Sequence, residues 1–193
     1  MQTKLYKPTL LFFFVLAFNT AFAQKDSIIY KIPMVGDKVV YSGTVTMKNK
    51  SAAQLDTASK TWFNSYFTSY QPVAPPHDAD TSSVFSQGVL QYKVRPGMVN
   101  IPFICRITIR VTCKDNQYSY SISDIYFRPK SDMLNSIGYQ NSPEYLIRVG
   151  KKKHLGLSTA MNVTRGQIRE YLTKMNTAIL ECVASLNKAL SRK

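Results

Sequence analysis

The stretch from Ile101 to Lys114 alternates between apolar and polar side chains over fourteen residues. Its apolar side chains are Phe103, Cys105, Ile107, Ile109, Val111 and Cys113, and its even positions include Arg106, Thr108, Arg110 and Thr112. Successive side chains of a β-strand point to opposite faces, so this pattern predicts a long strand with one buried and one polar face. The buried face needs a cover, and the polar face is left to water or to a partner.

Three further segments are expected to be strands: residues 38–46, 84–94 and 118–127. Lys114-Asp115-Asn116-Gln117 predicts a hairpin turn between the central strand and the last one. In that last strand the apolar positions change from even to odd numbers at Asp124, which predicts either a bulge or the end of the strand.

Two helices are predicted from capping boxes. Ser51 and Gln54 have the required spacing, and a helix should run from there to about Tyr70. Thr164 and Gln167 repeat the spacing at the start of a helix that reaches about Ser191. The apolar residues of the first helix are Leu55, Ala58, Trp62, Tyr66 and Phe67, and those of the second are Ile168, Leu172, Met175, Ile179, Cys182 and Leu186. Both sets recur every three or four residues, which predicts one buried face on each helix.

A shorter helix is expected from Ser142-Pro143-Glu144, because a cap, a proline and an acid follow one another there. The order of elements predicts an α+β fold, a two-layer sandwich of an antiparallel sheet with helices on one face. The long C-terminal helix would cover its own sheet; pairing with a second chain is the alternative.

The first 23 residues have the layout of a secretory signal peptide. Lys4 and Lys7 precede an apolar run at 10–18, and Ala21-Phe22-Ala23 is a small-x-small cleavage site. The run is shorter than the roughly 20 residues of a membrane span, although an uncleaved N-terminal anchor is the alternative. No cysteine follows the cleavage site, so a lipid anchor is not expected. We therefore predict an exported protein, periplasmic or secreted.

The chain that remains after cleavage is expected to have three parts. These are an extended segment at 24–37, an α+β domain at 38–130 and a C-terminal helical extension at 131–193 that packs on the same core. Loss of Lys4 and Lys7 lowers the net charge from +14 to +12, so the exported chain stays strongly basic.

The capped helix with Leu55 and Trp62-Phe63, and the hairpin from Lys114 to Tyr120, resemble a family of exported Bacteroidota domains of unknown function. The resemblance covers about residues 30–130. It implies a TATA-binding-protein-like (TBP-like) fold and an exported setting, and it supplies no catalytic residues. A TBP-like fold does not imply DNA binding, because function depends on the site and not on the fold.

The candidate binding residues are Arg106, Arg110 and Lys114, which share the polar face of the central strand. Lys93 and Arg95, or Arg128 and Lys130, are expected near them on neighbouring strands. Such a face would attract an anionic polymer or a membrane surface. The alternative is a generically basic protein, because lysine and arginine also occur along the C-terminal helix.

No catalytic, metal or cofactor site is predicted. His77-Asp78-Ala79-Asp80 gathers three possible ligands, but we expect a polar turn after the prolines, because no second histidine is nearby in the sequence. His154 follows three lysines in an expected solvated loop. Cys105 and Cys113 would lie about 26 Å apart along one strand and cannot form a disulfide. Cys182 could meet either of them; we expect three buried free thiols instead.

These observations favour an exported, non-enzymatic envelope domain that binds an anionic envelope component or a protein through its basic sheet face. Nucleic acid is not expected as a ligand outside the cytoplasm. An enzyme whose site is assembled from distant residues is the alternative, and a structural subunit of an envelope complex is a third interpretation. The oligomeric state stays open.

Overall fold

The computed structural model describes residues 31–67, 71–72, 82–95, 98–130, 141–151 and 164–192, without the side chains of residues 71, 72 and 82. The predicted signal peptide, the segment 77–80 and His154 lie outside these residues. The strands are β1 (Met34–Val35), β2 (Lys38–Val39), β3 (Tyr41–Thr46), β4 (Gln71–Pro72), β5 (Ser82–Val94), β6 (Ile101–Lys114) and β7 (Gln117–Pro129). The helices are α2 (Ala52–Tyr66), α4 (Pro143–Gly150) and α5 (Arg165–Ser191).

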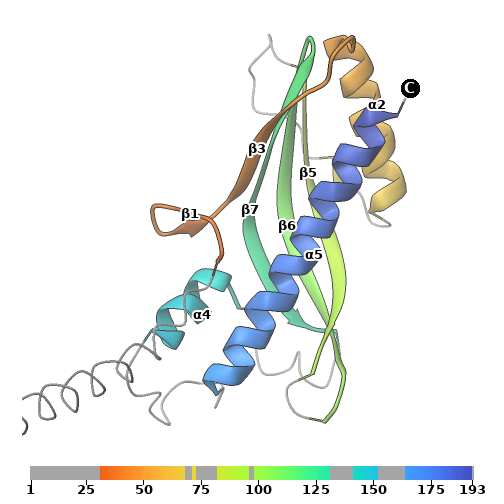
Figure 1. The fold of residues 1–193 in the computed structure, drawn as a ribbon. Helices are drawn as coiled ribbons and strands as arrows, with labels where there is room; N and C mark the ends of the chain where they lie inside the picture. The colour runs from red at the N-terminus through yellow and green to blue at the C-terminus, as the bar shows by residue number, and fades with distance from the viewer. Residues whose placement is uncertain are drawn as a thin grey trace, which may run out of the picture.

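A five-stranded antiparallel sheet forms one layer of the fold, in the order β3-β7-β6-β5-β4. Helices α2 and α5 form the other layer, side by side on one face of the sheet (Figure 1). This is the predicted α+β two-layer sandwich, with helices on one face of an antiparallel sheet.

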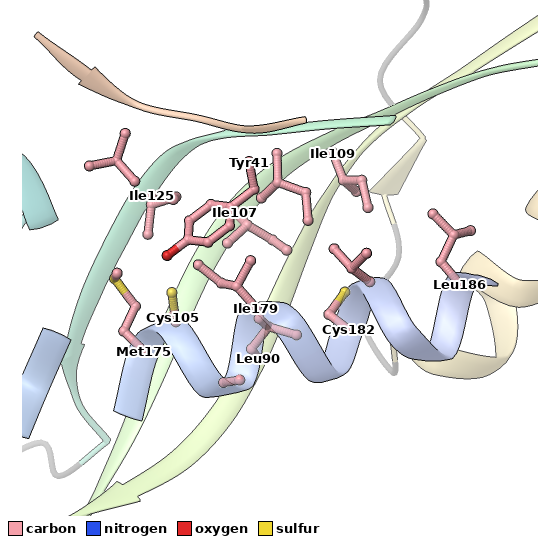
Figure 2. Close-up of a cluster of buried hydrophobic side chains, with 14 of the residues drawn as sticks. Tyr41, Leu90, Cys105, Ile107, Ile109, Ile125, Met175, Ile179, Cys182 and Leu186 are labelled. Atoms are coloured by element: carbon pink, nitrogen blue, oxygen red, sulfur yellow. The ribbon is translucent and has the colours of Figure 1, made fainter. Parts of the chain in front are cut away.

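The predicted alternation of β6 is confirmed. Its odd positions from Phe103 to Cys113 are all at most 4% exposed, whereas Arg106, Arg110 and Lys114 are exposed. Figure 2 shows how the buried side chains of β6 meet those of α5, with Cys105 and Ile107 on the sheet opposite Met175 and Ile179 on the helix. The apolar face of the central strand is therefore sealed by the C-terminal helix of the same chain.

All six predicted apolar residues of α5 are fully buried in that core. Three polar side chains of the helix also receive hydrogen bonds from aromatic donors. Tyr41 Oη donates to Asn176 Oδ1 at 2.7 Å, Trp62 Nε1 donates to Ser185 Oγ at 3.1 Å, and Tyr118 Oη donates to Asn187 Oδ1. These bonds satisfy partly buried polar groups and fix the position of α5 over both the sheet and α2.

The predicted capping boxes are present at both helices. The Ser51 hydroxyl accepts from the Gln54 amide and the Gln54 side chain accepts from Ser51, and Thr164 and Gln167 exchange the same pair of bonds. The short helix α4 is capped by the Ser142 side chain, as the sequence indicates.

Helix α2 ends earlier than the expected Tyr70. The chain turns to extended backbone at Phe67, and residues 68–70 lie outside the described part. The ring of Phe67 lies against the backbone of Gly88 on β5, where an added Cβ atom would overlap it. The buried ring holds the chain on the sheet just after the helix, and residues 71–72 form the short strand β4, which the sequence does not predict.

The change of phase at Asp124 is a bulge within β7. Arg106 pairs with Tyr126 and Thr108 with Ser123, so β7 has an extra residue opposite Ile107. Asp124 has a φ of 48°, in the left-handed region that aspartate tolerates better than most residues. The strand continues beyond the bulge, which excludes the alternative that it ends there.

Candidate binding face

The face of the sheet opposite α2 and α5 is called the outer face here. It consists of alternate side chains of four strands: Ser42, Thr44 and Thr46 of β3; Ser83, Phe85, Gln87, Val89, Gln91 and Lys93 of β5; Pro102, Ile104, Arg106, Thr108, Arg110, Thr112 and Lys114 of β6; and Gln117, Ser119, Ser121, Ser123, Tyr126 and Arg128 of β7. No described helix covers this face (Figure 1).

The strand register aligns the outer side chains in rows across the sheet. One row contains Val89, Arg106 and Tyr126, and the next contains Ile104 with Arg128. Because these rows are neighbours, the guanidinium groups of two strands lie on the same part of the outer face. The bulge sets this arrangement, since it shifts the outward positions of β7 to Tyr126 and Arg128.

A pocket of about 210 Å³ opens at these rows. It is lined by Gln87, Val89, Ile104, Arg106, Thr108, Asp124, Tyr126, Phe127 and Arg128. We call it the outer-face pocket. Two guanidinium groups and one carboxylate thus share a hollow with aromatic and aliphatic side chains.

Arg106 is the cation in this pocket for which the described part of the chain offers no partner. Its exposed guanidinium group makes no hydrogen bond, ion pair or ring contact with any residue that the structure describes. Asp124 is also exposed, and one of its oxygens accepts from Ser123 Oγ at 3.1 Å. The donors of Arg106 are therefore available to a ligand without the cost of breaking an existing ion pair.

Apolar side chains are also exposed in the outer-face pocket. Val89 is 39% exposed and Tyr126 is 43% exposed, whereas other valine and tyrosine side chains of this fold are buried in the core. An exposed aromatic ring next to an unpaired guanidinium is typical of a recognition surface, because the ring supplies contact area at low entropic cost.

The three candidate residues from the sequence differ in their surroundings. Arg106 lines the pocket, and the guanidinium of Arg110 lies 5.3 Å from the ring centroid of Phe85. Lys114 lies at the turn to β7, eight residues or about 26 Å along the strand from Arg106. The structure thus places all three on the outer face but brings only Arg106 into the pocket.

Of the neighbouring basic residues, Arg128 lines the pocket and Lys130 lies near it, donating to Gln91 Oε1 at 3.3 Å. Lys93 is exposed on β5, opposite Pro102. The backbone amide of Arg95 donates to Glu170 of α5.

Four pocket residues were not predicted from the sequence: Gln87, Val89, Asp124 and Tyr126. The change of phase at Asp124 was the available signal, because it shows that Tyr126 shares the face of Arg106. The pocket residues on β5 can be identified only from the register between β5 and β6, and a local sequence pattern does not encode that register.

The cysteines form no second site. All three are buried and free, as predicted. Burial raises the pKa of the Cys105 thiol to about 12, and burial raises the pKa of the Cys182 thiol to about 12 as well. These thiols are neutral at physiological pH and belong to the apolar core.

Among the described residues, no three side chains of His, Cys, Asp or Glu are grouped so that they could hold a metal ion. No helix in the described ranges is both long and apolar enough to cross a membrane.

Comparison with known proteins gives a family model and two solved structures. Residues 41–128 match the model of a domain of unknown function, DUF4468, with a TBP-like fold. A TBP-like protein from Parabacteroides distasonis superposes with a TM-score of 0.61 at 17% identity, covering 83% of this chain and 97% of the other. A DUF4468 family protein from Bacteroides ovatus gives 0.63 at 15% identity, covering 86% and 93%. A search of curated proteins finds no match.

Proposed function

Residues 41–128 are a DUF4468 domain with a TBP-like fold, and from this premise we propose that the protein is an exported, non-enzymatic binding module of the bacterial envelope. Its binding surface is the outer face of the sheet, and its ligand is an anionic envelope component. The observation that carries the proposal is the guanidinium of Arg106 inside the outer-face pocket, which has no partner among the described residues.

Charge supports an anionic ligand. The basic side chains of Arg106, Arg110, Lys114 and Arg128 belong to the outer face, and Asp124 is the carboxylate in the pocket. A surface with this balance raises the local concentration of anions and accelerates their association. The sheet is also a rigid scaffold, so the cations keep their spacing without a loss of backbone entropy on binding.

The exported setting rests on the leader at residues 1–23, with its two lysines, short apolar run and Ala21-Phe22-Ala23 site. Expression of the full chain in a Bacteroidota host tests it. Envelope or culture fractions should contain a mature protein that begins at Gln24, and an unprocessed cytoplasmic chain would contradict the proposal.

Binding is tested with residues 24–193 and dextran sulfate, a polyanion without carboxylates. We expect affinity that falls steeply as salt rises, because binding releases counterions. Arg106→Glu should weaken binding and lower the slope of log affinity against log salt by about 1 or more. Lys174→Glu is the matched control, since Lys174 is exposed on α5 in the opposite layer.

If Arg106→Glu and Lys174→Glu lowered the affinity for dextran sulfate equally, the proposal would be contradicted. Such a result would show that affinity comes from the overall positive charge and not from the outer face.

A further inference from the structure

We propose that the outer-face pocket binds one acidic sugar residue of an envelope polysaccharide, with the sugar carboxylate on Arg106. This inference rests on the proposed function and names the ligand class of the same face.

The pocket contains donors and acceptors of opposite charge. The guanidinium of Arg106 offers only hydrogen-bond donors, and the carboxylate oxygens of Asp124 are acceptors. Gln87 and Thr108 on the same walls can do both. A fitting ligand therefore needs an anionic group for the guanidinium and hydroxyl donors for the carboxylate.

A phosphate-rich ligand meets only half of this requirement. A fully ionised polyphosphate has no hydroxyl to donate to Asp124, and like charges at close range repel. A uronic acid carries one carboxylate and several hydroxyls on one ring. A planar carboxylate also matches the two parallel N–H donors of a guanidinium group.

The size and apolar lining fit a single ring. A volume of about 210 Å³ lies below the roughly 300–1,000 Å³ of pockets that enclose drug-sized ligands. The exposed ring of Tyr126 and the exposed side chain of Val89 offer contact area for the C–H faces of a sugar.

The rest of the outer face suits a polyhydroxylated polymer. Toward the β6–β7 turn, Thr44, Ser119, Thr112 and Ser83 form one row of small hydroxyl side chains, and Ser42 and Ser121 lie in the next row with Arg110. These hydroxyls donate and accept. On the β7 side Arg110 is flanked by Ser121, and on the β5 side it is flanked by the ring of Phe85. A free amino acid would match Arg106 and Asp124 through its two charges, but it would not use these rows.

The test is calorimetric titration of residues 24–193 with a short oligomer of galacturonic acid. Its methyl ester, inorganic polyphosphate, phosphatidylglycerol vesicles and free glutamate are titrated in parallel. We expect the acidic oligomer to bind, and the methyl ester to bind at least about tenfold more weakly because a charged hydrogen-bonded pair is lost.

Three variants test the assigned contacts. Arg106→Gln should lower the affinity for the acidic oligomer about 10- to 100-fold. Tyr126→Ala should weaken it by removing the ring contact. Asp124→Asn keeps a residue that tolerates positive φ. It should lower the affinity for the acidic oligomer and raise the affinity for polyphosphate. Lys174→Gln is the control and should change neither ligand.

Tighter binding of polyphosphate, vesicles or glutamate than of the acidic oligomer would overturn the inference, as would tighter oligomer binding by Asp124→Asn. If dextran sulfate binding still depends on Arg106 in that case, the proposed function stands and only the ligand class is wrong. If no anionic probe binds, both the ligand class and the proposed function are wrong.

Discussion

Gly88 is the residue that lets the ring of Phe67, just after α2, pack against β5. The side chain of Phe67, immediately after the helix, is buried against the backbone of β5 at this position. Any larger residue would occupy the volume of the ring. The end of α2 is therefore set by a close approach to a residue about twenty positions away, and not by a local stop signal.

Gly88→Ala should lower the free energy of unfolding by about 1–3 kcal/mol, the usual cost of overpacking a core. Urea unfolding of the purified domain measures it. Gly166→Ala is the matched control, because the added Cβ atom would lie 3.8 Å from Thr164 Oγ1, in ordinary contact. In the Gly88→Ala background, Phe67→Leu should restore part of the loss; a further loss would contradict the assigned contact.

The buried thiols make stability depend on alkaline pH. Burial raises the pKa of Cys105 from 9.0 to about 12, and burial raises the pKa of Cys182 over the same interval. In the unfolded chain each thiol loses its proton near pH 9, whereas the folded chain retains it. The free energy of unfolding should thus be undiminished below pH 9 and fall as pH rises from 9 toward 12.

Urea midpoints measured from about pH 8 to about pH 11 test this dependence. Cys105→Ala should make the decline shallower, because one of the groups that couple folding to deprotonation is gone. A midpoint that rises over this interval would contradict the buried, protonated state of the thiols.

At the scale of elements, α5 is the cover of the central strand. It contributes Ile168, Leu172, Met175, Ile179, Cys182 and Leu186 to the core, all fully buried. The periodicity of α5 and the alternation of β6 could both be predicted from the sequence, because each is a local repeat. The end of α2 and the strand β4 could not, because both depend on contacts with β5.

Leu172→Ala should lower the free energy of unfolding by about 2–5 kcal/mol through loss of buried surface and the cavity left behind. Light scattering should give the same mass for the folded variant and the parent protein. A dimeric parent that becomes a folded monomer on this substitution would show that the apolar face of α5 pairs with a second chain.

At the scale of the whole molecule, α2 and α5 cover one face of the sheet, and no helix within the described ranges covers the other. The sequence predicts which face of β6 is basic, since that follows from alternate residues on one strand. It does not contain the outer-face pocket, because the pocket needs the register of β5 and β7 with β6 and the displacement caused by the bulge. The outer-face pocket is thus less predictable than the fold, because it is built by pairing between segments that are distant in the sequence.

The claim that the open face of the sheet is the binding surface is tested most directly by amide chemical shifts. Residues 24–193, labelled with ¹⁵N, are titrated with the galacturonic acid oligomer. The largest shifts should fall at Arg106, Tyr126 and Arg128 and their neighbours on β5, with α2 and α5 unchanged. Shifts confined to α2 and α5, with the central strand unaffected, would contradict the account.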